Sequence, residues 1–342
     1  MKNKLFYIFI CVFIFFSYPV KSESIKDWEN KAKKESELVI HGRWRENTLW
    51  KDLYKEFKKD YPYININYER KGTKQNIKSI VTFRQTKKFD MDVFIGFSDY
   101  LDILYNGGHL ESLNSLPEYT MLKEEHKGIE NKWASYSIKA WCSVYHTKKI
   151  NSKELPNNLT DFLDYVIKTK KIVAVNNKEK VYSSFLSAYS KKEVLDKMDK
   201  VFSSKPYKTT SSLSNMFSLL SLGEFDFILY MGLDNVERYK EKGMPIEAHC
   251  FKEVPLTVTP VAIIKNSNSK YSAKLFVNWL LSKRGQELIY KIDGRLPVRK
   301  DFDEKIYFNK KDKTFLFRSW KTYLEDNDFT DKEWSKRFFN KR

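Results

Sequence analysis

Apolar and polar positions follow two alternating periodicities along the first third of the chain. Short apolar runs are each followed by a polar loop and then by a segment whose apolar side chains recur every three or four residues. The runs predict strands over 38–40, 64–68 and 92–96, and the segments predict helices over 49–57 and 77–83. Strands that alternate with helices indicate a parallel sheet covered on both faces, so we expect an α/β unit.

The same alternation restarts after a less regular stretch over 117–132. It predicts strands over 137–145, 171–175, 225–230 and 256–264, and helices over 159–166, 214–222 and 273–280. A second α/β unit is the simplest interpretation, and a length of 342 residues agrees with two domains. From residue 302 onward the chain is charged and aromatic, and we expect Phe315 to anchor a helix there.

The N-terminus has the order of a secretory signal peptide. Two lysines precede an unbroken apolar run of twelve residues over 5–16, and Val20-Lys21-Ser22 offers compact residues at the cleavage positions. A run of this length is shorter than the about 20 residues that a membrane-spanning helix needs. Cys11 lies inside the run without small residues before it, which argues against a lipoprotein. We therefore expect residues 1–22 to be removed and the mature chain to be periplasmic.

Charge is the unusual feature of the composition. The chain has 62 Lys+Arg against 44 Asp+Glu, a formal net charge of +18. Residues 1–22 hold three lysines and no acid, so the mature chain keeps 59 basic and 44 acidic residues, or +15. Only eleven of the basic residues are arginine, and a lysine surplus of this kind indicates a solvated surface. Export from the cytoplasm argues against nucleic acid as a partner.

The residue types that commonly carry catalysis form no known motif. The chain has no H-E-x-x-H, G-x-S-x-G, G-x-x-x-x-G-K-[ST] or Cys-x-x-Cys sequence, so we expect neither enzyme activity nor a cofactor. Two cysteines remain in the mature chain, Cys142 and Cys250, and in an oxidising compartment they either form a disulfide or stay as buried thiols. The five histidines are spaced one at a time, as His41, His109, His126, His146 and His249.

Five segments of the chain carry a family pattern. Residues 28–35 precede the first predicted strand, 57–64 fit F-x-K-x-Y-P-x-I, and 90–94 fit a strand that begins A-D-V. Residues 223–226 fit G-E-x-x, and 273–288 fit A-K-x-F-[IV]-x-[FW]-L-L-S-x-x-G-Q-E-L, followed by Arg295-Leu296-Pro297-Val298-Arg299. In this order they resemble the bacterial solute-binding proteins of ABC importers, most closely the group for ferric iron, phosphonate, thiamine and sugar phosphate. The resemblance covers nearly the whole mature chain.

The resemblance implies a type II periplasmic binding protein, in which two α/β lobes are joined by two crossing strands. We expect the crossings near 141–146 and 257–264. Lobe 1 would comprise 23–140 plus 262–342, and lobe 2 would comprise 141–261. Cys142 and Cys250 would both lie near the hinge, which slightly favours the disulfide. Members of the family are usually monomers that deliver their solute to a membrane permease.

Open α/β sheets bind ligands beyond the carboxyl ends of their strands, so the loops that follow the strands hold the candidate site. The candidates of the first lobe are Arg43, Trp44, Arg45, Glu46, Gly72, Thr73, Ser98 and Asp99. Those of the second lobe are Tyr182, Ser183, Ser184, Thr210, Ser211, Tyr230 and Asp234. Structural roles stay open for several of them: Trp44 can belong to the core, Ser98 and Thr210 can cap helices, and Asp234 can pair with Arg238 one turn later.

A ferric site is one possibility that the resemblance implies. Ferric-binding members place adjacent tyrosines where this chain has Leu233-Asp234, and phenolate oxygens suit the hard Fe(III) ion. Tyr230 alone is a poor substitute. A ferric site in this chain would have to combine Tyr230 with Glu46 and His41, so we regard iron as the alternative solute.

An anionic solute agrees better with the neighbouring side chains. Arg43 and Arg45 flank the first loop, and guanidinium groups make bidentate contacts with phosphate or carboxylate. The Ser- and Thr-rich helix starts near Ser183 and over 210–212 offer backbone N–H donors. We expect a small phosphorylated or carboxylated organic solute, captured by lobe closure and passed to the permease. A solute-sensing adaptor for a membrane sensor kinase is an alternative with the same fold.

Overall fold

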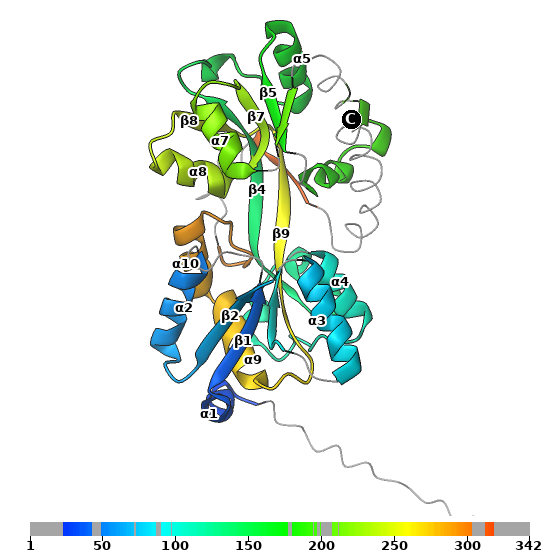
Figure 1. The fold of residues 1–342 in the computed structure, drawn as a ribbon, viewed down its shortest axis with the longest axis vertical. Helices are drawn as coiled ribbons and strands as arrows, with labels where there is room; N and C mark the ends of the chain where they lie inside the picture. Colours follow the sequence, from blue (N-terminus) through cyan, green and yellow to red (C-terminus); the bar gives the residue numbers. More distant parts are fainter. Residues whose placement is uncertain are drawn as a thin grey trace, which may run out of the picture.

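The computed structural model describes residues 23–42, 49–71, 73–86, 90–96, 98–176, 180–193, 195–196, 199, 207–210, 212–302 and 312–317. These residues form two α/β lobes, stacked along the long axis of the molecule and joined by two long strands, β4 (Ala134–His146) and β9 (Glu253–Ile263) (Figure 1). Within the described ranges, no helix combines the length and the apolar content that a membrane crossing requires.

The lower lobe in Figure 1 is built from two separate parts of the chain. Trp50, Leu53 and Phe57, whose spacing predicts a helix, are fully buried in one cluster with Leu38 and Ile40. The strands of this lobe are β1 (Glu37–Gly42), β2 (Asn65–Arg70) and β3 (Val93–Ile95). Its helices are α1 (Ile25–Glu35), α2 (Leu49–Asp60), α3 (Thr73–Thr86), α4 (Ser98–Asn106), α9 (Lys270–Leu281) and α10 (Lys283–Asp293), with the 3-10 turns η1 (Pro117–Met121), η2 (Glu124–His126) and η3 (Ile129–Asn131).

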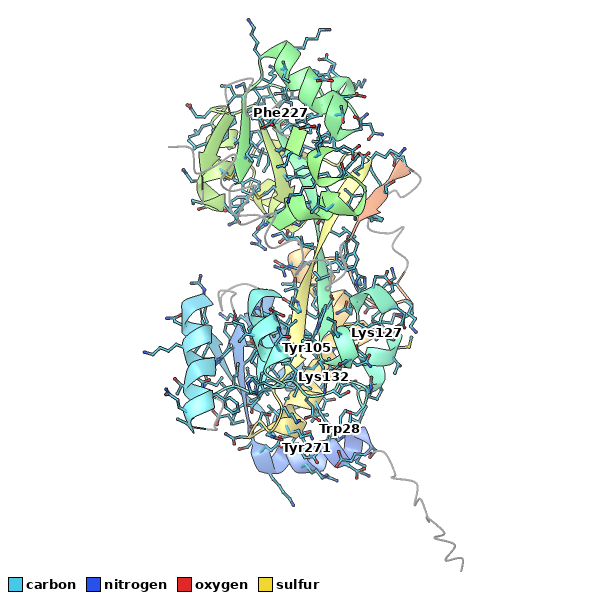
Figure 2. All side chains as sticks on the ribbon, turned by 90° about the vertical axis from the view of Figure 1, so that its right-hand side faces the viewer. Trp28, Tyr105, Lys127, Lys132, Phe227 and Tyr271 are labelled. Atoms are coloured by element: carbon cyan, nitrogen blue, oxygen red, sulfur yellow. A yellow bond between two sulfur atoms is a disulfide. The ribbon has the colours of Figure 1, made fainter. Side chains whose placement is uncertain are left out.

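The upper lobe has a core of its own. Phe162, Phe227 and Phe251 pack together there, whereas Trp28 lies in the core of the lower lobe (Figure 2). The strands of the upper lobe are β5 (Val173–Asn176), β6 (Tyr207–Thr210), β7 (Phe227–Gly232), β8 (Ile246–His249) and β10 (Thr314–Leu316). Its helices are α5 (Leu159–Thr169), α7 (Leu213–Ser221) and α8 (Leu233–Glu241), with the 3-10 turns η4 (Ser152–Glu154) and η5 (Lys180–Ser187).

The strands of both lobes belong to one mixed sheet. Its order is β2-β1-β3-β9-β4-β7-β5-β6, and β10 adds to β9 while β8 adds to β4. Strand β4 pairs with β9 from Ala134 to Ala140 and with β7 from Trp141 onward. The predicted crossing strands overlap β4 and β9, which both begin earlier in the sequence than expected. The α/β fold with two lobes is confirmed.

Strand β10 differs from the sequence-based expectation. The pattern predicts a helix around Phe315, but Thr314–Leu316 run parallel to Glu253, Val254 and Pro255 of β9. Leu316 packs in the core of the upper lobe, although the predicted boundary assigns 262–342 to the lower one. The reason is tertiary: β9 supplies the backbone hydrogen-bonding partners, and a local pattern does not reveal a partner so distant in sequence.

A buried aspartate precedes one parallel strand of each lobe. Asp92 lies before β3 and accepts a hydrogen bond from the Val39 N–H of β1, with 2.8 Å between N and O. Asp226 lies before β7 and accepts one from the Ile172 N–H, directly before β5, also at 2.8 Å. The backbone N–H of each aspartate donates to the carbonyl of the same partner residue, at 2.8 and 2.9 Å. Residues of the family segments 90–94 and 223–226 thus connect neighbouring parallel strands.

Cys142 and Cys250 form a disulfide, so the choice left open by the sequence is resolved in its favour. Cys142 lies on β4, and its neighbour Ser143 pairs with His249 of β8. The bond therefore joins β4 to the residue that follows β8, and both of its ends lie in the upper lobe.

Helix starts are satisfied in two ways, by a residue of another element or by the helix's own N-cap residue. Helix α9 receives no side-chain hydrogen bond from its own N-cap residue, Ser269. Glu35, at the end of α1, accepts hydrogen bonds from the Tyr271 and Ser272 N–H groups instead, at 3.1 and 2.8 Å. In the upper lobe, α5 is capped locally, because the Asn158 side chain accepts from the backbone N–H three residues later.

Candidate functional site

The carboxyl ends of the parallel strands in the two lobes face each other across the crossing strands. β3 ends at Ile95, opposite Val261 of β9, and β7 ends at Gly232, opposite Trp141 of β4. Both strands run antiparallel to their crossing partner, so their ends point to the stretch between the lobes, around residues 256–260 of β9. Helices α4 and α8 follow these two strand ends in the chain, and α3 and α7 follow strands β2 and β6 of the same two lobes (Figure 1). This arrangement defines the candidate site.

The first-lobe candidates that the structure describes stand at the first positions of two helices. Thr73 is the first residue of α3, and Ser98 is the first residue of α4, followed by Asp99. The structure thus brings the starts of two helices to the candidate site, while Arg43, Trp44, Arg45, Glu46 and Gly72 lie outside the described residues.

The second-lobe candidates lie mainly on η5 and at the end of β6. Tyr182, Ser183 and Ser184 belong to η5, Thr210 is the last residue of β6, and Ser211 lies outside the described residues. Ser184 is buried, and its hydroxyl donates to the carbonyl of Leu256 on β9 at 3.2 Å. The Ser184 hydroxyl therefore attaches η5 to a crossing strand.

Tyr230 belongs to the core of the upper lobe. Its side chain is 1% exposed, and its ring lies 5.4 Å from that of Phe185 and 6.0 Å from that of Phe251. All six residues of β7 are buried, so the strand has no exposed face on which Tyr230 could lie.

Asp234 lies in the first turn of α8 and is buried. Its Oδ1 is 3.3 Å from Lys139 Nζ, and its Oδ2 is 4.0 Å from Arg295 Nε. Asp234 does not pair with Arg238 one turn later in the helix, which was the local alternative. Arg238 pairs with Asp293 at the end of α10 instead. Tertiary partners thus outcompete the helical neighbour.

Lys139, Asp293 and Arg295 were missed by the sequence-based search, because none of them follows a predicted strand. Arg295 is 3% exposed and its Nε lies 2.6 Å from Asp293 Oδ2. Burial opposes the charge of Arg295, but the neighbouring Asp293 carboxylate outweighs it and raises the pKa of the guanidinium. The signal that could have found Arg295 is its place in segment 295–299, which contributes to the family resemblance.

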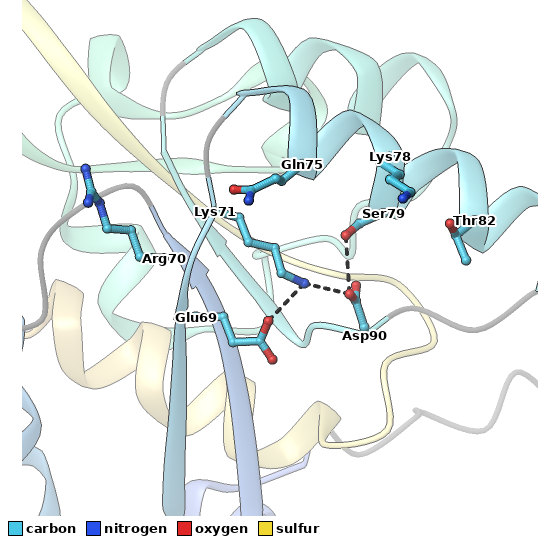
Figure 3. Close-up of a pocket in the computed structure, with 8 residues that line it drawn as sticks. All are labelled: Glu69, Arg70, Lys71, Gln75, Lys78, Ser79, Thr82 and Asp90. Carbon is cyan, nitrogen blue, oxygen red and sulfur yellow. Dashed lines mark hydrogen bonds and ion pairs between the residues drawn. The ribbon is translucent and has the colours of Figure 1, made fainter.

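A polar cavity of about 580 Å³ lies beside α3 in the lower lobe (Figure 3). Lys71 Nζ lies 2.9 Å from Glu69 Oε2 and 2.7 Å from Asp90 Oδ2, and Ser79 donates to Asp90 at 3.2 Å. Burial opposes the charge of Lys71, but its hydrogen bonds to the two carboxylates prevail and raise its pKa. The lining residues are Glu69, Arg70, Lys71, Gln75, Lys78, Ser79, Thr82 and Asp90.

His41 lies behind this cavity with an exposure of 0%. Its Nε2 is 3.4 Å from Glu69 and its Nδ1 is 3.9 Å from Asp90, so the two ring nitrogens face different carboxylates. Burial and the Lys71 ammonium lower the pKa of His41.

The ferric donor set is not assembled in the described part of the chain. Tyr230 lies in the upper core, His41 lies in the lower lobe, and Glu46 is outside the described residues. Among the residues that the structure describes, no three His, Cys, Asp or Glu side chains lie close enough together to hold a metal ion.

Comparison with known proteins agrees with the fold. Residues 91–325 match the model of the family described as bacterial extracellular solute-binding protein. None of the curated proteins compared with the chain matches it.

Solved structures of binding proteins share the architecture. Iron-bound HitA from Pseudomonas aeruginosa superposes with a TM-score of 0.64 at 22% identity, covering 78% of this chain and 88% of HitA. AfuA from Actinobacillus pleuropneumoniae with bound fructose-6-phosphate has a TM-score of 0.66 at 17% identity, with coverage of 88% and 98%. Trichodesmium IdiA (FutA) in complex with iron and citrate has a TM-score of 0.68 at 16% identity, with coverage of 89% and 99%. At these identities the likeness concerns the fold.

The family match spans more than half of the chain, and the same two-lobed fold occurs in binding proteins with different solutes. The chain belongs to the bacterial extracellular solute-binding proteins, with the type II periplasmic binding protein fold.

Proposed function

We propose that this protein captures a small phosphorylated or carboxylated organic anion between its two lobes and delivers it to the permease of an ABC transporter. One observation carries the proposal: the carboxyl ends of the parallel strands of both lobes face the same stretch between the lobes, where α/β folds bind ligands. The site binds its solute without chemical turnover.

The charge of the solute is inferred from the groups that follow the strand ends. Arg43 and Arg45 come one and three residues after Gly42, the last residue of β1. Helices α4, α7 and α8 each begin within three residues of the preceding strand end, so their N-terminal N–H groups lie near the candidate site. Guanidinium groups and helix N-termini both favour oxyanions. AfuA, a structural neighbour, holds a sugar phosphate.

Iron remains the competing solute, since HitA and IdiA are iron-bound neighbours. Two observations weigh against it in this chain. Leu233 and Asp234 occupy the place of the tyrosine pair, and the carboxylate of Asp234 is already engaged with Lys139 and Arg295.

Calorimetry with purified protein tests the choice of solute. The panel is fructose-6-phosphate, inorganic phosphate, citrate, an alkylphosphonate and ferric citrate. We expect one organic anion to bind, and Arg43→Gln and Arg45→Gln each to weaken its binding about tenfold or more, the order expected for a lost bidentate contact. Lys51→Gln is the matched control, since Lys51 is an exposed cation on α2, and it should leave the affinity unchanged. Tight ferric binding with no response to the organic anions would contradict the proposal.

The mechanism is closure of the lobes around the solute. A solute that contacts both lobes stabilises the closed arrangement by its differential affinity for the two states. Small-angle scattering should therefore show a smaller radius of gyration at saturating solute. An unchanged scattering curve under those conditions would argue against closure.

The proposal also includes removal of the signal peptide, the oligomeric state and the boundaries of the lobes. Residues 1–22 are removed on export to the periplasm, and the mature protein acts as a monomer. The lobes are divided near residues 140 and 262, with β10 (Thr314–Leu316) added to the upper lobe. The mass of the exported chain tests the removal of residues 1–22, and its size in solution tests the monomer. Retention of residues 1–22 would contradict the first point.

A further inference from the structure

A partly buried network of ion pairs lies where helix α8 of the upper lobe meets the end of α10 in the lower lobe, with Arg238 at its exposed end (Figure 1). We call Lys139, Asp234, Arg238, Asp293 and Arg295 the cross-lobe network. Asp234 lies between Lys139 and Arg295, and Asp293 lies between Arg295 and Arg238. The side chains of Asp234, Asp293 and Arg295 are each no more than 4% exposed.

The members of the network come from three parts of the molecule: helix α8, the end of α10 with the residues after it, and strand β4. Asp234 and Arg238 belong to α8, whereas Asp293 and Arg295 belong to the lower lobe. Lys139 lies on β4, two residues before that strand changes its partner from β9 to β7. Any rotation about the crossing strands therefore changes the distances within the network.

The backbones also approach closely at this point. A methyl group placed on the Cα of Gly294 would lie 3.6 Å from the Asp234 Cα. Gly294 has φ 66° and ends α10, a conformation that glycine adopts without strain. The network therefore lies at a point where the backbones of α8 and the end of α10 are in close contact.

The energetic consequence follows from burial. Removing one member of a buried ion pair leaves an uncompensated charge in a poorly solvated place, which is strongly unfavourable. A lobe arrangement that moves α8 away from the end of α10 while Asp234, Asp293 and Arg295 stay buried leaves these charges unpaired. The network disfavours such an arrangement relative to the one in which the pairs form.

We propose that the cross-lobe network by itself, without any solute, holds the two lobes in the arrangement seen here, so that a change in lobe arrangement has to break it. The proposal is independent of which solute is bound. Loss of the network would let the solute-free lobes sample a wider range of arrangements.

Distance measurement between spin labels in the two lobes tests this without any solute. Labels on Lys58→Cys in α2 and Lys168→Cys in α5 use exposed positions of the lower and upper lobe, with the native disulfide kept oxidised. In Asp293→Asn, we expect a second distance population, with the population ratio changed about tenfold or more relative to the unaltered network, as for the loss of a buried ion pair. Arg238→Gln removes one pair only and should produce a smaller change in the same direction.

The matched control is Glu247→Gln. It breaks a pair between Lys240 of the same helix α8 and Glu247 of β8, at 2.8 Å, within the upper lobe. Its distance distribution should equal that of the parent. Thermal unfolding identifies any variant that fails to fold. If Asp293→Asn does not fold, the distance distribution of Arg238→Gln decides the test. Unchanged distributions in Arg238→Gln and Asp293→Asn, or an equal change in Glu247→Gln, would overturn the proposal.

Discussion

The two lobes connect their parallel strands with the same aspartate geometry but in different electrostatic surroundings. In the lower lobe, Asp92 accepts hydrogen bonds from the Val39 and Ser269 N–H groups, at 2.8 and 3.0 Å. These donors are neutral, and burial raises the pKa of Asp92.

In the upper lobe, Asp226 accepts from the Ile172 N–H and has two ammonium groups nearby, those of Lys149 at 3.2 Å and Lys171 at 3.8 Å. The comparison shows that the strand connection depends on the carboxylate hydrogen bonds, which both lobes share. Among the contacts described, only the aspartate of the upper lobe, Asp226, has positively charged side chains beside it. The upper lobe also holds the disulfide, so the lobes should respond differently to several perturbations.

Removal of the disulfide should give the largest difference between the lobes. Cys142 and Cys250 are 108 positions apart, and in the chain-entropy account closing a loop of this length contributes about 4–5 kcal/mol. Cys142→Ser combined with Cys250→Ser should lower the free energy of unfolding of the upper lobe by about this amount. The urea concentration at which the lower lobe unfolds should not change. Urea unfolding with lobe-specific fluorescence checks it. Equal loss in both lobes would show that they unfold as one unit.

Asp92→Ala and Asp226→Ala compare the strand connections directly. Asp92→Ala leaves two buried backbone N–H donors without their acceptor, and at about 2 kcal/mol each the loss is about 4 kcal/mol. Asp226→Ala leaves one such donor, and Lys149 and Lys171 can turn to water, so the loss should be about 2 kcal/mol. Denaturant unfolding measures both. A larger loss in Asp226→Ala would mean that the lysine pairs dominate.

Acid should destabilise the lower lobe through His126. Burial lowers the pKa of His126 to about 4, so the folded state favours the neutral ring. As pH falls from 6.5 towards 4, the unfolded chain binds the proton first, and about 3 kcal/mol of stability is lost by pH 4. His126→Phe should remove this part of the pH dependence. His249 of the upper lobe, whose pKa burial also lowers, serves for comparison, and an unchanged pH profile in His126→Phe would contradict the prediction.

The helix caps should give the smallest effects. Glu35→Ala removes the acceptor of two N–H groups at the start of α9 and should cost about 2 kcal/mol, whereas Asn158→Ala removes a local cap of α5 and should cost about 1 kcal/mol. Thermal unfolding distinguishes the two, since Glu35 also holds α1 to α9. Equal shifts would show that the contact between these helices adds nothing beyond capping.

The sequence predicts the order of strands and helices well, because buried strands and amphipathic helices leave strong local periodicities. It fails where a tertiary partner decides. Phe315 lies in β10 because distant residues of β9 pair with it. Asp234 pairs with Lys139 and Arg295 rather than with Arg238, since burial favours partners from other elements over the neighbour one turn later. The solute-contacting role predicted for Thr73, Ser98 and the other candidates stays a prediction.

Native mass spectrometry of the protein, purified from the periplasm under mild conditions, detects a captured solute as added mass on the chain. We expect one phosphorylated or carboxylated small molecule per chain, lost when Arg43→Gln and Arg45→Gln are combined and retained in Lys51→Gln. An iron adduct of one ion per chain, or retention of the same organic molecule by the double arginine variant, would contradict it.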